Sequence, residues 1–232
     1  MPDKHNIGLE RETSLHAALK QWCSQPGDCF EVRLDSGHVA DILCADNLSI
    51  IEIQTRSFSS LKRKLAKLVE ERPVLLVHPV AQTRTIVRIS VDGEIVSQRK
   101  SPRKGRAEQV FKELVSFPAL TLHPNFVLDV LLIHEEQIWR DDGEGSWRRK
   151  GWSIADRRLV EVVERVTLAT AADFARFLPS TLPETFTVKD LATASKLLRP
   201  LAGKMAFCLR EMDIINVVGK QGKAWVYSRC IS

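Results

Sequence analysis

The sequence lacks a hydrophobic run approaching the roughly 20 residues that a membrane-spanning helix needs. Residues 1–14 contain no apolar segment of the secretory type, so we expect a cytoplasmic protein without membrane association. The five cysteines form no C-x-x-C motif, which argues against a zinc site or disulfide framework and favours reduced, mostly buried thiols. Also missing are a Gly-rich phosphate loop, a spacing typical of a Ser/His/Asp or Cys/His nucleophile, internal repeats and low-complexity tracts.

The composition that is present is ordinary for a globular protein. Hydrophobic residues make up 44% and charged residues 27% of the 232 residues, enough for one large domain or two smaller ones. The formal net charge is +5 and the pI is about 9.0, a basic balance that permits nucleic-acid binding without requiring it.

Two short apolar runs carry polar residues of a kind that is costly to bury. Asp41 lies in the first run, and Glu52 and Gln54 lie in the second. Because side chains alternate along a strand, Glu52 and Gln54 share one face while Ile51 and Ile53 share the other. A carboxylate in such a place needs a partner, and Mg²⁺ is a natural one because it takes carboxylate and carbonyl oxygens.

At these residues, over roughly positions 7–80, the sequence resembles the PD-(D/E)xK nuclease superfamily, which has the restriction-endonuclease-like fold. The family pattern is a helix with a Glu, then a hairpin with an Asp and a following Glu-x-Lys. Asp41 and Glu52 match the two acids of the hairpin. Gln54 stands where Lys is usual, as in some active restriction enzymes, and Ala40 replaces the proline of the name.

The resemblance implies a site for Mg²⁺ (or Mn²⁺), with Asp41 and Glu52 as ligands and the carbonyl of Ile53 as a third donor. Gln54 would orient the attacking water or touch the phosphate. In the absence of the usual lysine, Lys62 or Lys64 on the next helix would supply the positive charge. The alternative is structural: Asp41 caps a turn, and Glu52 forms an ion pair with one of these lysines.

Glu12 is the candidate acid of the first helix, because it falls within the apolar stripe of that helix. It is equally well interpreted as a partly exposed residue or as a partner of His16. For His16 the alternatives are a satisfied core histidine, which is the commoner case, and a metal-site neighbour or general base.

The order of expected elements is that of the nuclease core: a helix, three strands, a helix and a strand. An Asp92–Gly93 hairpin, another helix and two strands around an acidic turn follow. The expected elements are a helix at 6–23, strands at 29–34, 38–44 and 49–55, a helix from 57 ended by Pro73, strands at 74–77, 86–89 and 94–96, a helix at 107–115, and strands at 126–139 and 147–152.

The composition changes again near Thr170. Short helices are expected at 171–178 and 187–193, a longer one from Pro200, and strands at 214–218 and 224–228. Over roughly 170–230 this pattern resembles a winged helix-turn-helix. The fold class is therefore α/β, a restriction-endonuclease-like mixed sheet flanked by helices, followed by an α+β winged helix domain. The expected domains are 1–168, with a core at about 7–97, and 169–232.

Basic residues supply the candidate DNA contacts. The basic run at 99–106 would hold DNA phosphates or would be a solvated linker. The basic run at 148–150 would contact DNA or would protect a sheet edge by its charge. Winged helices bind DNA or proteins. The candidate nucleic-acid-binding residues are Lys62, Lys64, Arg103, Lys104, Arg148, Arg149, Lys150, Arg199, Lys204, Arg210, Lys220 and Lys223.

The sequence thus predicts a DNA-binding, Mg²⁺-dependent endonuclease, which DNA binding would associate with the nucleoid. Nucleases of the fold it resembles are often homodimers, while the sequence itself does not set the oligomeric state. The alternative is a catalytically silent DNA-binding regulator or recruitment protein that acts through its winged helix, an interpretation motivated by the missing lysine. A protein-interaction scaffold is a third interpretation.

Overall fold

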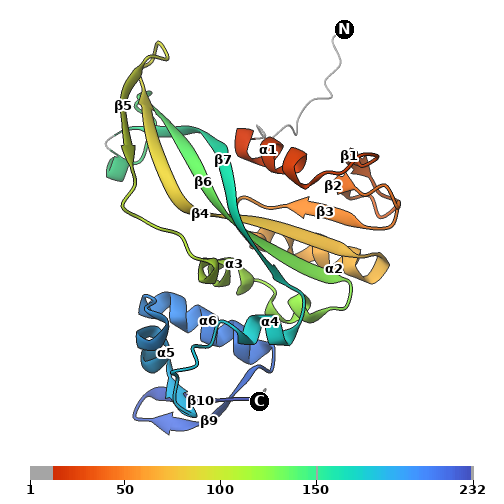
Figure 1. Cartoon of the computed structure of the whole chain (residues 1–232), viewed down its shortest axis with the longest axis vertical. Coiled ribbons are helices and arrows are strands. Elements are labelled where there is room, and N and C mark those ends of the chain that lie inside the picture. The colour runs from red at the N-terminus through yellow and green to blue at the C-terminus, as the bar shows by residue number, and fades with distance from the viewer. Residues whose placement is uncertain (1–12, 150, 231–232) are drawn as a thin grey trace.

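The computed structural model describes residues 13–149 and 151–230 (Figure 1). The chain is an α/β protein with a large mixed sheet flanked by helices and a smaller antiparallel sheet at its C-terminal end. The large sheet has seven strands in the order β1-β2-β3-β4-β6-β7, with β5 paired to β4. The small sheet has the order β8-β10-β9.

The first helix and three antiparallel strands carry most of the residues of interest. Thr13 caps the helix, since its side chain accepts the backbone N–H of His16. Strands β1, β2 and β3 pair antiparallel in sequence order. The elements are α1 (Ser14–Cys23), β1 (Cys29–Arg33), β2 (Val39–Leu43) and β3 (Ile50–Ile53).

A helical crossover then leads from β3 into the centre of the sheet. Strand β4 is parallel to β3 on one side and to β6 on the other, while β5 and β7 are antiparallel to their neighbours. The turn at Asp92–Gly93 joins β4 and β5 as the sequence predicts. The elements are η1 (Phe58–Leu61), α2 (Lys62–Glu71), β4 (Val74–Ile89), β5 (Ile95–Lys100), β6 (Phe126–Arg140) and β7 (Ser153–Leu168).

The two faces of the large sheet bury separate apolar clusters. The α1 side holds Leu15 and Leu19 of the helix with Ile51 and Ile53 of β3. The α2 side holds Leu65 among others, in a larger cluster that continues into the C-terminal segment. The predicted alternation in β3 is therefore confirmed, because Ile51 and Ile53 pack toward α1 while Glu52 faces the other way.

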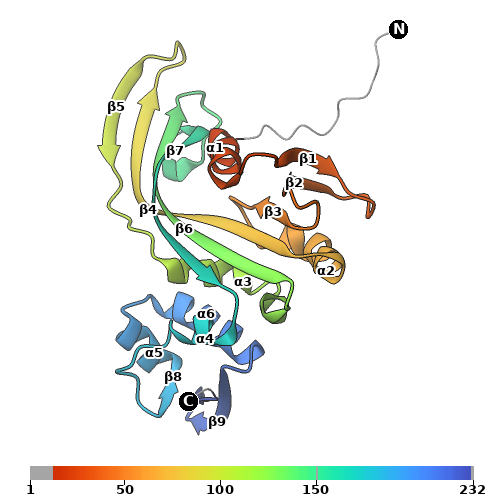
Figure 2. The ribbon, with the colours of Figure 1, turned by 45° about the vertical axis from the view of Figure 1, so that its right-hand side comes forward.

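The C-terminal segment, residues 171–229, packs its longest helix against the connection between β5 and β6 (Figure 2). The rings of Phe111 and Phe177 meet edge to face, with centroids 5.2 Å apart. Capping boxes at Thr170 and Thr187 start the first two helices. The elements are η2 (Ala107–Val110), α3 (Phe111–Leu114), η3 (Pro118–Leu122), α4 (Ala171–Ala175), β8 (Thr185–Thr187), α5 (Val188–Ser195), α6 (Arg199–Glu211), β9 (Ile215–Gln221) and β10 (Ala224–Arg229).

Four expected elements are wrong. The strands at 74–77 and 86–89 are one 16-residue strand, because pairing with β6 continues through the polar residues between them. The helix at 107–115 is a 3₁₀ turn followed by a four-residue helix. Residues 147–149 form a 3₁₀ turn, η4 (Trp147–Arg149), and the strand that follows is β7. Of the expected helix at 6–23, residues 6–12 lie outside the described residues.

The five cysteines are free, as expected from their spacing, but the expectation that most are buried is wrong. Only Cys208 is fully buried, where burial raises the pKa of its thiol to about 12, while Cys29 and Cys230 are exposed. In residues 13–149 and 151–230, no helix is long and apolar enough to cross a membrane.

Gly105 provides a test of how the segment between β5 and β6 packs against β4. Its N–H donates to the carbonyl of Ala81 at 2.9 Å, and a Cβ at this position would overlap that carbonyl. We expect Gly105→Ala to lower the free energy of unfolding by about 1–3 kcal/mol, measured by urea denaturation. Gly219→Ala is the control, because a Cβ there meets open space. Equal stability of the two variants would contradict this packing.

Candidate functional site

Asp41 of β2 and the backbone of β3 form one half of the site. The backbone N–H of Ile53 donates to Asp41 Oδ2 at 2.7 Å. His16 Nε2, from α1, lies 3.4 Å from the same carboxylate oxygen and 3.0 Å from the carbonyl oxygen of Ile53. Ser14 holds the start of α1 in place, because its hydroxyl donates to Asp156 of β7 at 2.6 Å. The imidazole thus sits against two oxygens that the resemblance assigns to a metal.

Asp41 is ionised near neutral pH. Burial works to raise the pKa of Asp41, but hydrogen bonds from His16 and from the N–H of Ile53 outweigh it. The result is a pKa below the ordinary value for an aspartate. His16 lies beside the acid, and the same two contacts satisfy its ring, so both interpretations of this histidine stay open.

Glu52 forms the other half, and it is only 2% exposed. Lys64 Nζ, from α2, lies 2.5 Å from Glu52 Oε2 and also donates to the carbonyl of Val39 at 2.6 Å. Burial raises the pKa of Glu52 to about 7, although the charge of Lys64 works in the opposite direction. Asp41 is close enough for its negative charge to raise this pKa further.

The second carboxylate oxygen of Glu52 is the unusual atom of the site. Among the described residues, Oε1 is buried without a hydrogen-bond partner. A buried acceptor without a donor is costly unless a ligand, an ion or a water satisfies it. This open oxygen, the carboxylate of Asp41 and the carbonyl of Ile53 are donors of the type that Mg²⁺ or Mn²⁺ takes. Within the described part of the chain, no three or more His, Cys, Asp or Glu side chains group as a complete metal site.

Gln54 points into the turn that starts the next helix. Its Nε2 donates to the carbonyl of Ser57 at 2.9 Å and to Ser60 Oγ at 3.3 Å, and its Oε1 accepts the N–H of Arg56 at 3.5 Å. Its backbone carbonyl lies 2.6 Å from Nδ1 of His78. Within residues 13–149 and 151–230, the hydrogen bonds of the Gln54 side chain go to its own turn and to neither acid, whereas Lys64 reaches Glu52.

The remaining candidates of the N-terminal part are scattered. Lys62, Arg103 and Lys104 are exposed, and Arg149 Nε donates to the carbonyl of Trp152 at 3.0 Å. Arg148 lies in the turn η4. Glu12 and Lys150 lie outside the described residues.

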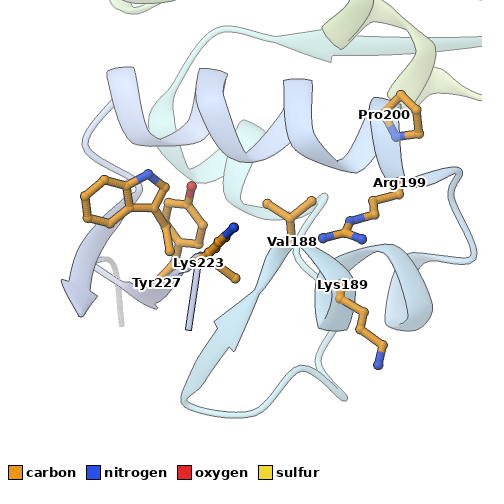
Figure 3. Close-up of a pocket in the computed structure, with 8 residues that line it drawn as sticks. Val188, Lys189, Arg199, Pro200, Lys223 and Tyr227 are labelled. Atoms are coloured by element: carbon orange, nitrogen blue, oxygen red, sulfur yellow. The ribbon is translucent and has the colours of Figure 1, made fainter. Parts of the chain in front are cut away.

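Some of the C-terminal candidates contact other protein groups, and others line a pocket. Lys204 Nζ donates to the carbonyl of Lys112 in α3 at 3.3 Å. Arg210 pairs with Glu211, and Lys220 lies over the ring of Trp225. Arg199 and Lys223 line a pocket of the C-terminal segment (Figure 3).

Sequence reasoning missed a buried arginine–glutamate cluster beside β3. Glu135 of β6 is 1% exposed and is bound by Arg84 of β4 and Arg157 of β7. Arg157 also donates to the carbonyl of Thr55 at 3.2 Å, so it ties β7 to the chain that leaves β3. The one sequence signal was the acid of Glu135 inside a long apolar run.

A polar cleft of about 840 Å³ opens next to this cluster. Thr13 at the start of α1 and Thr55 after β3 are among the residues that line it. It is lined by four arginines and three acids, but Arg157 is bound to Glu135 and Arg158 is paired with Asp156, so the arginines of the cleft are partly neutralised. The charged lining residues are Arg56, Arg140, Arg157, Arg158, Asp142, Glu144 and Asp156.

The raised pKa of Glu52 predicts a pH-dependent stability in metal-free buffer. Between its ordinary value of 4.5 and about 7, folded Glu52 keeps a proton that the unfolded chain has released. Its contribution to stability therefore falls as pH rises through this window, by about 3 kcal/mol in total. Glu52→Gln cannot titrate, so its stability relative to wild type should rise by that amount from below pH 4.5 to above pH 7.

Urea unfolding across this pH range measures the difference, with Glu71→Gln, an exposed acid of α2, as the control. A difference between Glu52→Gln and wild type that stays constant with pH would contradict the raised pKa.

Comparisons with known proteins place the site within a family. A family described as "Domain of unknown function (DUF8091)" matches residues 13–169, which hold α1, the whole large sheet and the Asp41–Glu52 pair. A protein of Treponema pallidum (strain Nichols), described as an uncharacterized protein, is 37% identical over 186 residues, or 80% of this chain and 73% of that protein. No solved structure matches the chain. The chain belongs to the DUF8091 family, a domain of unknown function.

Proposed function

We propose that the protein is a DNA-binding, divalent-metal-dependent endonuclease that hydrolyses phosphodiester bonds with Asp41 and Glu52 at its active site. The observation that carries the proposal is Glu52, a buried carboxylate with one open oxygen, close to the ionised Asp41 and bound by Lys64. Acids with pKa values pushed apart in this way are typical of catalytic sites.

The order and direction of the elements support this proposal. Helix α1 precedes three antiparallel strands, and α2 then leads to β4, which is parallel to β3. This order is the one that the PD-(D/E)xK resemblance implies, with the acids on the second and third strands. The fold by itself does not fix a function, so the proposal depends on the site.

Asp41, Glu52 and the carbonyl of Ile53 would hold Mg²⁺ or Mn²⁺. When bound, such an ion lowers the pKa of a coordinated water and stabilises the charge that develops on a phosphate. Asp41 is already ionised, and its carboxylate is fixed by the N–H of Ile53. A fixed ligand loses little conformational freedom when the ion binds.

Lys64 supplies the positive charge that the resemblance usually places two residues after the glutamate. Its ammonium lies against Glu52, and it favours the ionised form that a metal ligand needs. His16 acts as a positioning residue, because its ring contacts both Asp41 and the carbonyl of Ile53. Gln54 contributes by fixing the start of α2, the helix that carries Lys64.

The arginine-bearing cleft beside β3 offers a surface for the DNA backbone. The C-terminal segment offers another, since three helices and a three-stranded sheet with a basic hairpin are the pattern of a winged helix. A cytoplasmic, nucleoid-associated location would follow from DNA binding. The homodimer expected by analogy with related folds stays a prediction.

One observation favours the alternative, a silent DNA-binding regulator on a nuclease-like scaffold. Lys64 neutralises one oxygen of Glu52, and the side chain of Gln54 has its partners within its own turn. A site already satisfied in this way is also what a structural ion pair would look like. Metal-dependent cleavage separates the two functions.

We expect the protein to cut at least one of linear, nicked, branched or single-stranded DNA in Mg²⁺ or Mn²⁺, assayed by gel electrophoresis. Asp41→Asn and Glu52→Gln should each lower the rate by about 100-fold or more, because each removes a metal ligand. Glu71→Gln, an exposed acid on α2, should cut at the wild-type rate. Binding without cutting for every substrate and metal would favour the silent regulator instead.

We expect Lys64→Gln to lower the cleavage rate by about 10- to 100-fold, the range for groups that contact a metal ligand, while DNA binding in EDTA stays unchanged. Lys64→Arg should recover part of the rate because it restores the charge. Lys67→Gln is the matched control, since Lys67 lies on the same helix and, within the described residues, its ammonium donates only to the carbonyl of Ser36. Full cleavage activity in Lys64→Gln would contradict a role of Lys64 in cleavage and leave its ion pair with Glu52 as a structural one.

A further inference from the structure

The C-terminal segment contains a pocket of about 400 Å³ that none of the preceding chemistry uses. Its walls come from the N-terminal ends of α5 and α6 and from the hairpin of β9 and β10 (Figure 3). Val188 lies at its centre in the figure, with Arg199 on one side and Lys223 on the other. The volume falls within the range of about 300–1,000 Å³ that is usual for small-molecule and cofactor sites.

Three cations from three different elements line this pocket: Lys189 of α5, Arg199 of α6 and Lys223 of the hairpin turn. In the described part of the chain, no ion pair or side-chain hydrogen bond satisfies any of them. No carboxylate lines the pocket among the described residues. The adjacent Asp190 is turned to the capping box, where it accepts from the N–H and hydroxyl of Thr187. The charge of Lys189 acts on this carboxylate, whereas Arg199 and Lys223 have no acidic partner among the described residues. Two such cations in a concave site favour an anionic ligand.

The pocket also offers an aromatic surface. Trp225 lines it and is 47% exposed, while the ammonium of Lys220 lies 4.1 Å from the centroid of its ring. Tyr227, which is buried against Phe186, forms another part of the wall. Single-stranded nucleic-acid sites combine an exposed aromatic ring with nearby positive charge. The ring stacks on a base, since every base has a face that can stack, and the positive charge binds the phosphates.

The packing of α6 argues against the usual alternative, a duplex laid along this helix. Helix α6 contacts α3, η2 and η3, which lie between it and the large sheet (Figures 1 and 2). Lys204, in the middle of α6, is bonded to the carbonyl of Lys112 in α3. Arg210 is paired with Glu211 and lies over Phe207. Arg199 is therefore the cation of α6 that remains open, and it faces the pocket.

We propose that this pocket binds one unstacked nucleotide of a single-stranded nucleic acid, with the base against Trp225 and the phosphate held by Arg199 or Lys223, the two cations that flank Val188. The inference rests on the proposed nuclease function and names its substrate class: DNA with a single-stranded segment or end. The basic, aromatic pocket holds the single strand while the acids at Asp41 and Glu52 act on the same molecule of DNA.

The test is binding of a fluorescein-labelled single strand of about 12 nucleotides, a length within the usual site sizes of single-strand binders, followed by fluorescence anisotropy. A blunt duplex of the same sequence is the comparison. The measurement is made in EDTA, so that it does not depend on cleavage. We expect the single strand to bind at least about 10-fold more tightly than the duplex, with an affinity that falls as salt rises.

Trp225→Ala should weaken single-strand binding by about 10-fold, and Trp225→Phe should weaken it much less because a ring remains. Arg199→Gln combined with Lys223→Gln should weaken it and reduce its salt dependence, without touching the indole. Lys196→Gln removes an exposed cation of the same segment outside the pocket and is the matched control. Circular dichroism and thermal melting establish that each variant is folded.

Three results would overturn the inference: wild-type affinity in both pocket variants, tighter binding of the duplex, or no binding of either DNA. The proposed nuclease function fails separately, in the cleavage assay. If cleavage depends on Glu52 but the pocket variants bind DNA as tightly as wild type, only the pocket proposal is contradicted. If binding depends on the pocket but no DNA is cut, only the proposed nuclease function is contradicted.

Discussion

The burial of Glu52 in the short central strand β3 is the constraint that brings the rest of the site together. A carboxylate taken out of water is costly unless charge and hydrogen bonds compensate it, and here part of the compensation comes from Lys64. That contact fixes α2 against β3, and Asp41 fixes β2 against the next residue of the same strand. His16 then adds α1 through the carbonyl of Ile53. One polar network therefore connects both faces of the sheet.

The sequence was a good guide where a local pattern decides the structure. Alternation in β3 placed Glu52 opposite Ile51 and Ile53, and the helical stripe placed His16 on the sheet-facing side of α1. It was a poor guide where tertiary pairing decides. Strand β4 continues through polar residues such as Arg84 because its partner β6 supplies Glu135. Strand β7, rich in charges, was not expected at all, because its exposed side is solvated.

The side-chain directions of the site were not accessible from sequence either. Lys62 and Lys64 were equal candidates, and only the packing of α2 decides that Lys64 reaches Glu52. The position of Gln54 in the sequence suggested a role at the acids, whereas its amide bonds the turn before α2. In the C-terminal segment, α6 packs on α3, so Lys204 bonds the backbone of α3 while Arg199 lines the pocket. The helical stripe alone does not show which of these two cations is free to bind a ligand.

Both proposals attribute different tasks to the two sheets of the protein. The large sheet supplies the acids and a polar cleft lined by arginines and carboxylates, and the small sheet supplies a basic pocket with an exposed indole. The two parts share one apolar cluster, so a nucleic acid bound by one would be held at a defined position relative to the other. Such a division is suited to a substrate that is partly duplex and partly single-stranded.

Mn²⁺ binding, followed by electron paramagnetic resonance, tests the central claim most directly. A metal site at Asp41 and Glu52 predicts that wild-type protein removes free Mn²⁺ from solution and that Asp41→Asn and Glu52→Gln lose this binding, while Glu71→Gln keeps it. Equal Mn²⁺ binding by wild type and both site variants, or none by any of them, would contradict a catalytic metal site and leave Glu52 and Lys64 as a structural ion pair.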